Sequence, residues 1–177
     1  MVTISSLGCD GTCGTCLCVR EKNEGRRRAV LTLVRPDQVR RLFRSKFPWE
    51  PVTPAPAMVA SWLRRSFANG TLRYIPDPPD CDRWCSPAAT LELGGGDCDD
   101  LAILGASMLV AAGELPAVVI GRHCAGLTCA GHAWIEGRDA RGGYLLEPTT
   151  GELHRGRRPL AYKADLAVIP NPLRRVA

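Results

Sequence analysis

Three residue types that together carry out thiol catalysis occur in separate parts of this 177-residue chain. Cys98 follows three glycines and begins an apolar run, His132 opens an alternating segment, and Glu147 ends a short apolar segment. A thiol nucleophile, an imidazole base and a carboxylate that orients the imidazole are the groups needed to attack an amide carbonyl. These three residues are therefore the candidate catalytic residues.

The residues around Cys98 predict that it lies in the first turn of a helix. Asp97 is a good N-cap, and Asp100 stands three residues later, where a capping box has its second polar residue. Apolar residues then recur at helical spacing until Gly113. Free N–H groups and the helix dipole favour a thiolate here and can serve an oxyanion, whereas the neighbouring carboxylates oppose ionisation. A nearby cation is therefore needed.

The segments that begin with His132 and end with Glu147 predict two strands joined by a turn rich in Gly and Arg. If the hairpin is centred between Asp139 and Ala140, His132 lies directly opposite Glu147. Directly opposed residues share a face and lie close together. Packing of the helix that begins at Cys98 against this face would complete a Cys–His–carboxylate arrangement.

The sequence also contains two alternatives to this site. His123 could compete as the base, but it lacks a strand-start context and an opposing carboxylate, so His132 is preferred. The carboxylates beside the nucleophile could bind a divalent cation. An EF-hand loop that starts at Asp97 fails, because its fifth position is Leu101 and its twelfth is Met108.

Several short motifs occur in a fixed order between about Ala57 and Thr150. They are LRYIPDPP at 72–79, SP at 86–87, GGDCDD at 95–100, GHAWIE at 131–136 and LEPT at 146–149. Together they resemble the transglutaminase-like superfamily, whose fold is related to that of papain, and most of all its small bacterial and phage-encoded members. The resemblance implies Cys98 as nucleophile, His132 as base and Glu147 as third member, a position where the family usually has Asp.

The resemblance implies an α+β fold with a papain-like core, in which the nucleophile stands at a helix N-terminus packed on an antiparallel sheet. We expect this domain over residues 29–170, after a cysteine-rich, basic extension over 1–28 and before a flexible tail over 171–177. Periodicity predicts a strand over 29–34 and an amphipathic helix over 57–69.

Eight of the nine cysteines remain after Cys98 is assigned. Four thiols crowd into ten residues near the start and could bind zinc or an iron–sulfur cluster, form local disulfides or stay free. Two further pairs flank the catalytic segments, which suggests that these pairs meet as one zinc site, as two disulfides or as free thiols. The two groups are Cys9, Cys13, Cys16 and Cys18, and Cys81, Cys85, Cys124 and Cys129.

Charge and hydropathy favour neither nucleic acid nor a membrane as a partner. The net charge is +5 and arginines cluster, but no aromatic-interleaved or helix-turn-helix pattern accompanies them, so a solvated basic surface is preferred over nucleic-acid binding. The first residues lack the apolar core of a signal peptide, and no apolar run has the length of a membrane span. We therefore expect a cytoplasmic protein, or a virion protein if the gene is phage-encoded.

The sequence predicts an amide-bond hydrolase, peptidase or deamidase, that acts on a protein or peptide through a thioester and needs no cofactor for that chemistry. Trp62 and Trp84 are candidates for lining the substrate cleft and donating an indole N–H to the oxyanion. One alternative is transglutaminase-type acyl transfer to an amine. Another is a phage or prophage particle component that uses the fold without catalysis, with an assembly partner for the N-terminal extension.

Overall fold

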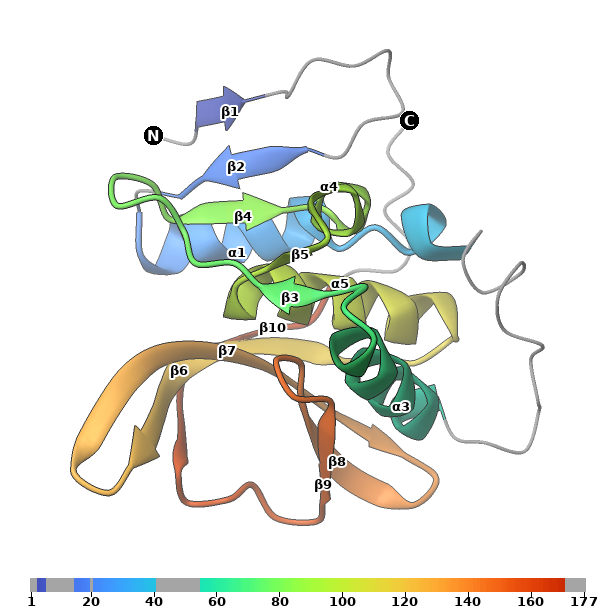
Figure 1. Ribbon diagram of the computed structural model, residues 1–177. Helices are drawn as coiled ribbons and strands as arrows, with labels where there is room; N and C mark the ends of the chain where they lie inside the picture. The colour runs from blue at the N-terminus through green and yellow to red at the C-terminus, as the bar shows by residue number, and fades with distance from the viewer. Residues whose placement is uncertain (1–2, 6–14, 20, 41–54, 171–177) are drawn as a thin grey trace.

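The computed structural model describes residues 3–5, 15–19, 21–40 and 55–170. A central helix lies between a large antiparallel sheet and a small sheet (Figure 1). The helices include α1 (Asn23–Leu33), α3 (Ala55–Ala68), α4 (Pro87–Leu93) and the central α5 (Cys98–Ala111). The small sheet has the order β1 (Thr3–Ser5), β2 (Cys16–Cys18) and β4 (Arg83–Cys85).

The large sheet is antiparallel throughout and has the strand order β10-β6-β7-β8-β9. Its strands are β6 (Ala117–Ala125), β7 (Thr128–Asp139), β8 (Gly142–Glu147), β9 (Glu152–Arg155) and β10 (Tyr162–Val168). A short parallel pair joins β3 (Arg73–Tyr74) to β5 (Gly95–Gly96), immediately before α5. The expected α+β architecture is confirmed.

Helix α5 is buried on all sides, which explains why its sequence is apolar almost throughout. Leu101, Ile103 and Leu104 are fully buried in the main core. Gly105 permits close contact with β7, because a Cβ at that position would lie 2.7 Å from Cδ1 of Ile135. The helix that begins with Cys98 is therefore fixed against the strand that carries His132.

Residues 29–33 are helical, so the strand predicted over 29–34 is wrong. They belong to α1, whose buried residues Gly25, Ala29, Val30 and Leu33 recur at helical spacing. The three arginines at 26–28 hide this period in the sequence, because they interrupt the apolar pattern ahead of the run. The expected boundary after residue 28 falls inside α1, and β2 before it pairs with β4.

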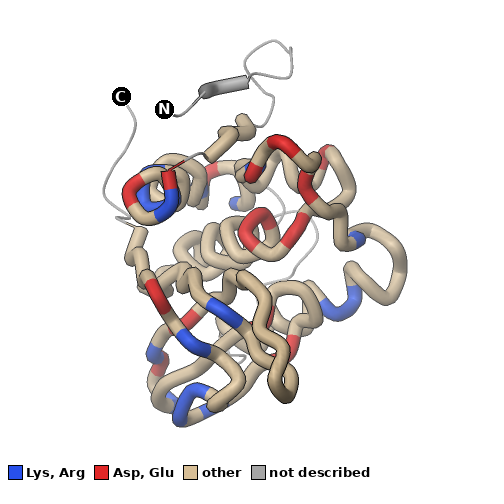
Figure 2. The backbone as a smooth tube through the Cα atoms, turned by 90° about the vertical axis from the view of Figure 1, so that its left-hand side faces the viewer, with Lys and Arg blue, Asp and Glu red and all other residues tan. Residues whose placement is uncertain are grey.

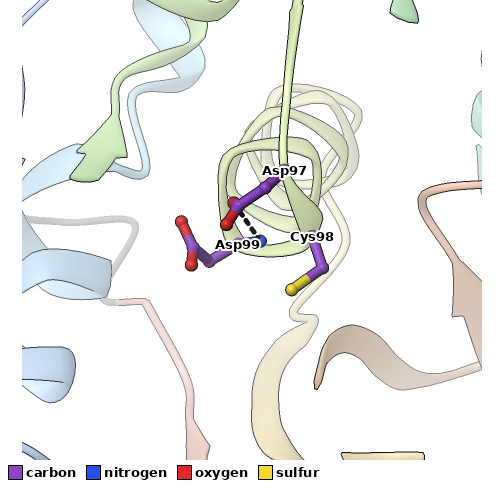
Figure 3. A group of neighbouring side chains, drawn as sticks. All are labelled: Asp97, Cys98 and Asp99. Carbon is purple, nitrogen blue, oxygen red and sulfur yellow. Dashed lines mark hydrogen bonds between the residues drawn. The ribbon is translucent and has the colours of Figure 1, made fainter. Parts of the chain in front are cut away.

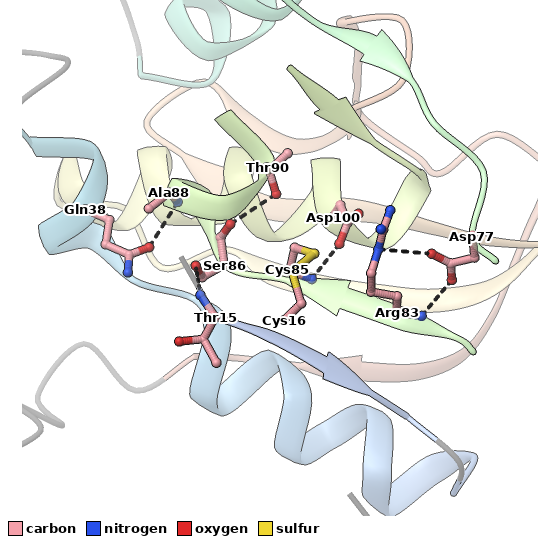
Figure 4. Close-up of a disulfide and its surroundings, with 10 residues drawn as sticks. All are labelled: Thr15, Cys16, Gln38, Asp77, Arg83, Cys85, Ser86, Ala88, Thr90 and Asp100. Atoms are coloured by element: carbon pink, nitrogen blue, oxygen red, sulfur yellow. Dashed lines mark hydrogen bonds and ion pairs between the residues drawn. A yellow bond between two sulfur atoms is a disulfide. The ribbon is translucent and has the colours of Figure 1, made fainter. Parts of the chain in front are cut away.

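All six of the remaining cysteines that lie within the described residues are disulfide-bonded. Cys16 is bonded to Cys85 and Cys18 to Cys81, which ties β2 to β4, while Cys124 and Cys129 are bonded across the β6–β7 hairpin (Figure 4 shows the first of these bridges). The zinc and iron–sulfur hypotheses are therefore wrong for these six cysteines. Cys81 and Cys85 do not share a site with Cys124 and Cys129, because each is bonded to another partner. Cys9 and Cys13 lie outside the described residues.

The described part of the chain includes no helix that is both long and apolar enough to cross a membrane.

The two bridges between β2 and β4 should stabilise the fold cooperatively. They close loops of 69 and 63 residues over nearly the same span. When one bridge is removed and the other remains, only a short ring is opened, so the loss of chain entropy predicts a cost of roughly 2–3 kcal/mol in unfolding free energy. Removing the second bridge opens the long loop and costs about 4 kcal/mol more. We expect Cys16→Ala/Cys85→Ala and Cys18→Ala/Cys81→Ala each to cost that smaller amount, and the quadruple variant to cost about 7 kcal/mol.

Urea denaturation of the four proteins measures this coupling. The double variant Cys124→Ala/Cys129→Ala, which opens a span of only 5 residues, is the matched control. A quadruple variant that loses no more than the sum of the two double variants would contradict the shared-loop explanation.

Candidate active site

The start of α5 is built by the glycine run and by Asp97. Gly95 has φ +146° and pairs with Arg73, and a Cβ there would lie 1.9 Å from the Arg73 carbonyl oxygen. Asp97 is the N-cap, and its Oδ1 accepts a hydrogen bond from the Asp99 N–H at 3.2 Å. The glycines therefore let the chain pass against β3 and deliver Cys98 to the first helical position.

The capping-box role predicted for Asp100 is wrong. Its Oδ1 accepts a hydrogen bond from the backbone N–H of Cys85 at 2.6 Å, so the side chain joins α5 to β4 instead of returning to its own helix (Figure 4). Asp100 is fully buried, and a Cβ on Gly96 would collide with its carboxylate. The Asp100 side chain therefore bonds a distant strand, although its spacing from Asp97 predicts a helix cap.

His132 and Glu147 form a direct pair, with 2.7 Å between Nε2 and Oε2. The hairpin register differs from the expected one, since Ile135 pairs with Leu146 and the turn is centred between Ala140 and Arg141. Glu147 is therefore diagonal to His132 on the same face, not directly opposite. Because Nε2 faces the carboxylate, Nδ1 is the ring nitrogen left to exchange a proton with a thiol.

The Glu147 carboxylate is buried and well supplied with donors. Oε1 accepts from the N–H and the hydroxyl of Thr149, at 3.0 and 2.6 Å, and Oε2 also accepts from the Tyr162 hydroxyl at 3.0 Å. Burial acts to raise the pKa of Glu147, but the hydrogen bond and charge of His132, with the bonds from Thr149, hold that pKa below its usual value. The third candidate residue is thus an ionised, oriented carboxylate.

Cys98 and His132 line one pocket of about 200 Å³. Strand β8 pairs with β7 only from Ile135 onward, so His132 lies on a stretch of β7 that has a strand partner on one side only. This open edge allows the imidazole and the thiol to reach the same pocket. The other lining residues are Arg26, Asp82, Trp84, Asp97, Asp99, Ile120, Gly121, Gly131 and Ala133.

A larger cavity of about 360 Å³ contains neither Cys98 nor His132. It is lined by Leu115, Tyr144 and Arg158, among others. The smaller pocket is the candidate active site, because it alone of the two holds the nucleophile and the base.

The environment of the Cys98 sulfur opposes ionisation. Burial raises the pKa of the thiol, the carboxylates of Asp99 and Asp97 raise it further, and a hydrogen bond from the Ala133 backbone N–H lowers it. The structure therefore repeats the conflict seen in the sequence. A positive charge beside the two aspartates would relieve it.

The aspartates near Cys98 form an acidic cluster, which consists of Asp77, Asp82, Asp97, Asp99 and Asp100. Acidic positions gather in the upper half of Figure 2, and Figure 3 shows the carboxylates of Asp97 and Asp99 next to each other beside the Cys98 side chain at the start of the helix. Burial, followed by the charge of Asp97, raises the pKa of Asp77 to about 6 and that of Asp100 to about 7.

Three oxygens of this acidic cluster are buried without a hydrogen-bond partner among the described residues. They are Oδ1 of Asp77, Oδ1 of Asp99 and Oδ2 of Asp100. One atom each from Asp97, Cys98 and Asp99 also lie within 4.8 Å of one another, close enough to share an ion. Buried carboxylate oxygens without donors are costly unless they are protonated or bind a cation.

The two tryptophans proposed for the cleft differ in position. Trp84 lines the pocket, but its indole N–H donates to Oδ1 of Asp82 at 2.7 Å and is not free for an oxyanion. Trp62 is half-buried, packs against the main core and is absent from the lining of this pocket, so its cleft role stays a prediction. His123 packs against the Tyr162 ring, with centroids 4.6 Å apart.

Sequence reasoning missed several residues of this site. Thr149 had a local signal, because a hydroxyl two residues after a carboxylate can bond back to it. Tyr162, Asp77 and Arg26 had none, because they reach the site only through tertiary packing of β10, the β3–β4 loop and α1.

Comparison with known proteins supports the fold. No protein-family model and no curated protein matches the sequence. Among solved structures, calcium-bound LapG of Legionella pneumophila is 19% identical, with a TM-score of 0.56 over 75% of this chain and 73% of that one. EGTA-treated LapG is 18% identical, with a TM-score of 0.54 over 77% of this chain and 82% of that one.

A candidate cysteine protease from Cytophaga hutchinsonii is 18% identical, with a TM-score of 0.51 over 66% of this chain and 38% of that one. The fold is transglutaminase-like. The expected papain-like core, with an antiparallel sheet and the candidate nucleophile at a helix N-terminus, is thereby confirmed. At these identities the comparison shows the fold alone.

The raised pKa of Asp100 predicts how stability depends on pH. Between its usual 3.8 and about 7 the folded protein binds a proton that the unfolded chain releases, so the free energy of unfolding falls as pH rises through that range. Asp100→Asn keeps the acceptor for the Cys85 N–H and removes this loss. Between pH 5 and 8 we expect the free energy of unfolding of the variant to fall by about 1–3 kcal/mol less than that of the wild type.

Urea denaturation in chelator at each pH measures this difference. Asp165→Asn, at a carboxylate 56% exposed, is the matched control and should follow the wild type. Parallel curves for wild type and Asp100→Asn would contradict the assignment.

Proposed function

We propose that the protein is a cysteine peptidase in which Cys98 is the nucleophile, His132 the base and Glu147 the residue that orients the imidazole. The observation that carries the proposal is the part-buried His132–Glu147 pair at 2.7 Å, whose imidazole lines the same pocket as the Cys98 thiol. The position of Cys98 at the first residue of α5 supports it, and so does the fold shared with a candidate cysteine protease.

The reaction follows from these positions. His132 Nδ1 accepts the thiol proton as Cys98 Sγ attacks the amide carbonyl carbon, and the same proton passes to the leaving amine nitrogen as the C–N bond breaks. The Cys98 N–H lies in the first turn, where amides have no intrahelical acceptor, and can donate to the oxyanion. Water, deprotonated by the imidazole, then hydrolyses the thioester and restores the thiol.

A divalent cation on the acidic cluster completes the proposal. LapG has been observed in a calcium-bound form. The partnerless oxygens of Asp99 and Asp100 fit such an ion, because calcium takes carboxylate oxygens, whereas Oδ1 of Asp77 lies 3.9 Å from Nε of Arg83. Its charge would offset the carboxylates of Asp97 and Asp99, which raise the pKa of the Cys98 thiol. The residues of this chain would hold the ion, and the peptidase steps remain those of Cys98 and His132.

The disulfides weigh against the cytoplasmic location expected from the sequence. Disulfides persist in oxidising compartments and are rare where cellular thiols keep cysteines reduced. Three bridges within the described residues, two of them across long loops, favour a protein that works in an oxidising environment.

The thiolate–imidazolium pair predicts selective alkylation of one cysteine. Cys98 is the only free cysteine among the described residues. With limiting iodoacetamide and calcium, Cys98 should react first and stay reactive below the usual thiol pKa. His132→Ala should slow this reaction at least tenfold near pH 6.5, and His154→Ala should not. Intact-mass analysis and peptide mapping across pH 5 to 9 measure the rates, and an inert Cys98 would favour a non-catalytic interaction role.

Calcium should stabilise the protein in proportion to the ionisation of the acidic cluster. At 100 times its dissociation constant a ligand adds about 2.7 kcal/mol, which is roughly 5–10 °C in Tm for a chain of this size. Because protons compete for the same oxygens, the shift should be larger at pH 7.5 than at pH 5. Thermal unfolding with calcium and with EGTA measures it. Asp99→Asn should abolish the shift and Asp165→Asn should keep it; equal shifts in both variants would contradict this site.

A further inference from the structure

Tyr162, the first residue of β10, touches the candidate catalytic pair from an edge strand of the sheet. Its hydroxyl donates to Oε2 of Glu147 at 3.0 Å, and the same oxygen bonds Nε2 of His132 at 2.7 Å. The tyrosine is 8% exposed and the glutamate 4%. One buried carboxylate oxygen is thus held between a phenol and an imidazole.

The two oxygens of Glu147 are held by different parts of the chain. Oε1 is bonded by the N–H and hydroxyl of Thr149, two residues away, so these bonds follow the local turn. Oε2 has only His132 and Tyr162 as partners among the described residues. Without the tyrosine hydroxyl, the oxygen that faces the imidazole would be held by the imidazole alone.

Packing fixes the hydroxyl independently of this bond. The Tyr162 ring meets Trp134 edge-on, with centroids 5.2 Å apart, and lies against His123 at 4.6 Å. The Trp134 indole N–H donates to Oε1 of Glu136 at 2.7 Å, and Glu136 is paired in turn with Arg158. The packed rings of Trp134 and His123 therefore hold the Tyr162 hydroxyl next to Glu147.

We propose that Tyr162 is a positioning residue for the catalytic imidazole: its hydroxyl fixes Oε2 of Glu147, which holds the His132 ring with Nδ1 presented to the pocket. This inference rests on the proposed function. Tyr162 is absent from the lining of the pocket that holds Cys98, so it acts through Glu147 and not on substrate.

Tyr144 provides a matched control. It is 4% exposed and lies in the same sheet, but its hydroxyl has no hydrogen-bond partner among the described residues. Tyr144→Phe therefore removes a buried hydroxyl without removing a hydrogen bond, whereas Tyr162→Phe removes one bond and keeps the ring.

Two readouts separate a positioning role from a structural one. The first is the rate of Cys98 alkylation by iodoacetamide at pH 6.5 with calcium. The second is the downfield NMR signal of the His132 Nε2–H, which is assigned readily because the chain has three histidines. Tyr162→Phe should slow alkylation about tenfold and broaden or remove the signal, while Tyr144→Phe should leave both as in the wild type.

Thr149→Val keeps the test decisive if Tyr162→Phe fails to fold. It leaves Tyr162 on Oε2, so the His132 signal should persist; its loss in this variant would mean that Thr149 holds the carboxylate and would overturn the inference. Wild-type behaviour of a folded Tyr162→Phe in both readouts would overturn it too. An inert Cys98 in the wild-type protein, with the His132 signal present, would instead count against the proposed peptidase.

Discussion

The packing of α5 against β7 is the contact on which the candidate site depends. Gly105 lets the helix approach Ile135, and complete burial of the helix leaves it no freedom to shift along the strand. Cys98 at one end of this helix is thereby held beside His132 on the strand. The thiol and the imidazole come from segments more than thirty residues apart, so this close-packed contact, not local sequence, determines that they share a pocket.

Burial opposes the ionisation of the Glu147 carboxylate and of the acidic cluster, but the two differ in how many hydrogen bonds offset it. Glu147 has four donors and a pKa below its usual value, so it stays ionised and can orient an imidazole. In the acidic cluster around Cys98, Oδ1 of Asp99 and Oδ2 of Asp100 are buried without a hydrogen-bond partner among the described residues, and the pKa values of Asp99 and Asp100 are raised. The Glu147 carboxylate is satisfied by the protein itself, whereas a proton or a cation would satisfy the free oxygens of Asp99 and Asp100.

Local patterns were sufficient to predict the helix start at Cys98 and the two strands that carry His132 and Glu147, because capping and alternation are short-range signals. They failed wherever a distant segment decides the outcome. Asp100 bonds Cys85 instead of capping its helix, and Tyr162 reaches Glu147 from another strand. The disulfide partners of Cys81 and Cys85 could not be predicted, since spacing along the chain does not reveal which segments pair across a sheet.

The shifted hairpin register explains why a glutamate suits the third position. One step beyond the pair of Ile135 and Leu146, Glu147 lies opposite Trp134, so its partner His132 is its diagonal neighbour. Diagonal residues are about 7–8 Å apart, against about 4.5–5.5 Å for directly opposed ones. An extra methylene spans part of that difference and still allows a 2.7 Å hydrogen bond. The length of the carboxylate side chain and the register of the hairpin are therefore matched, and a change in either would require a change in the other.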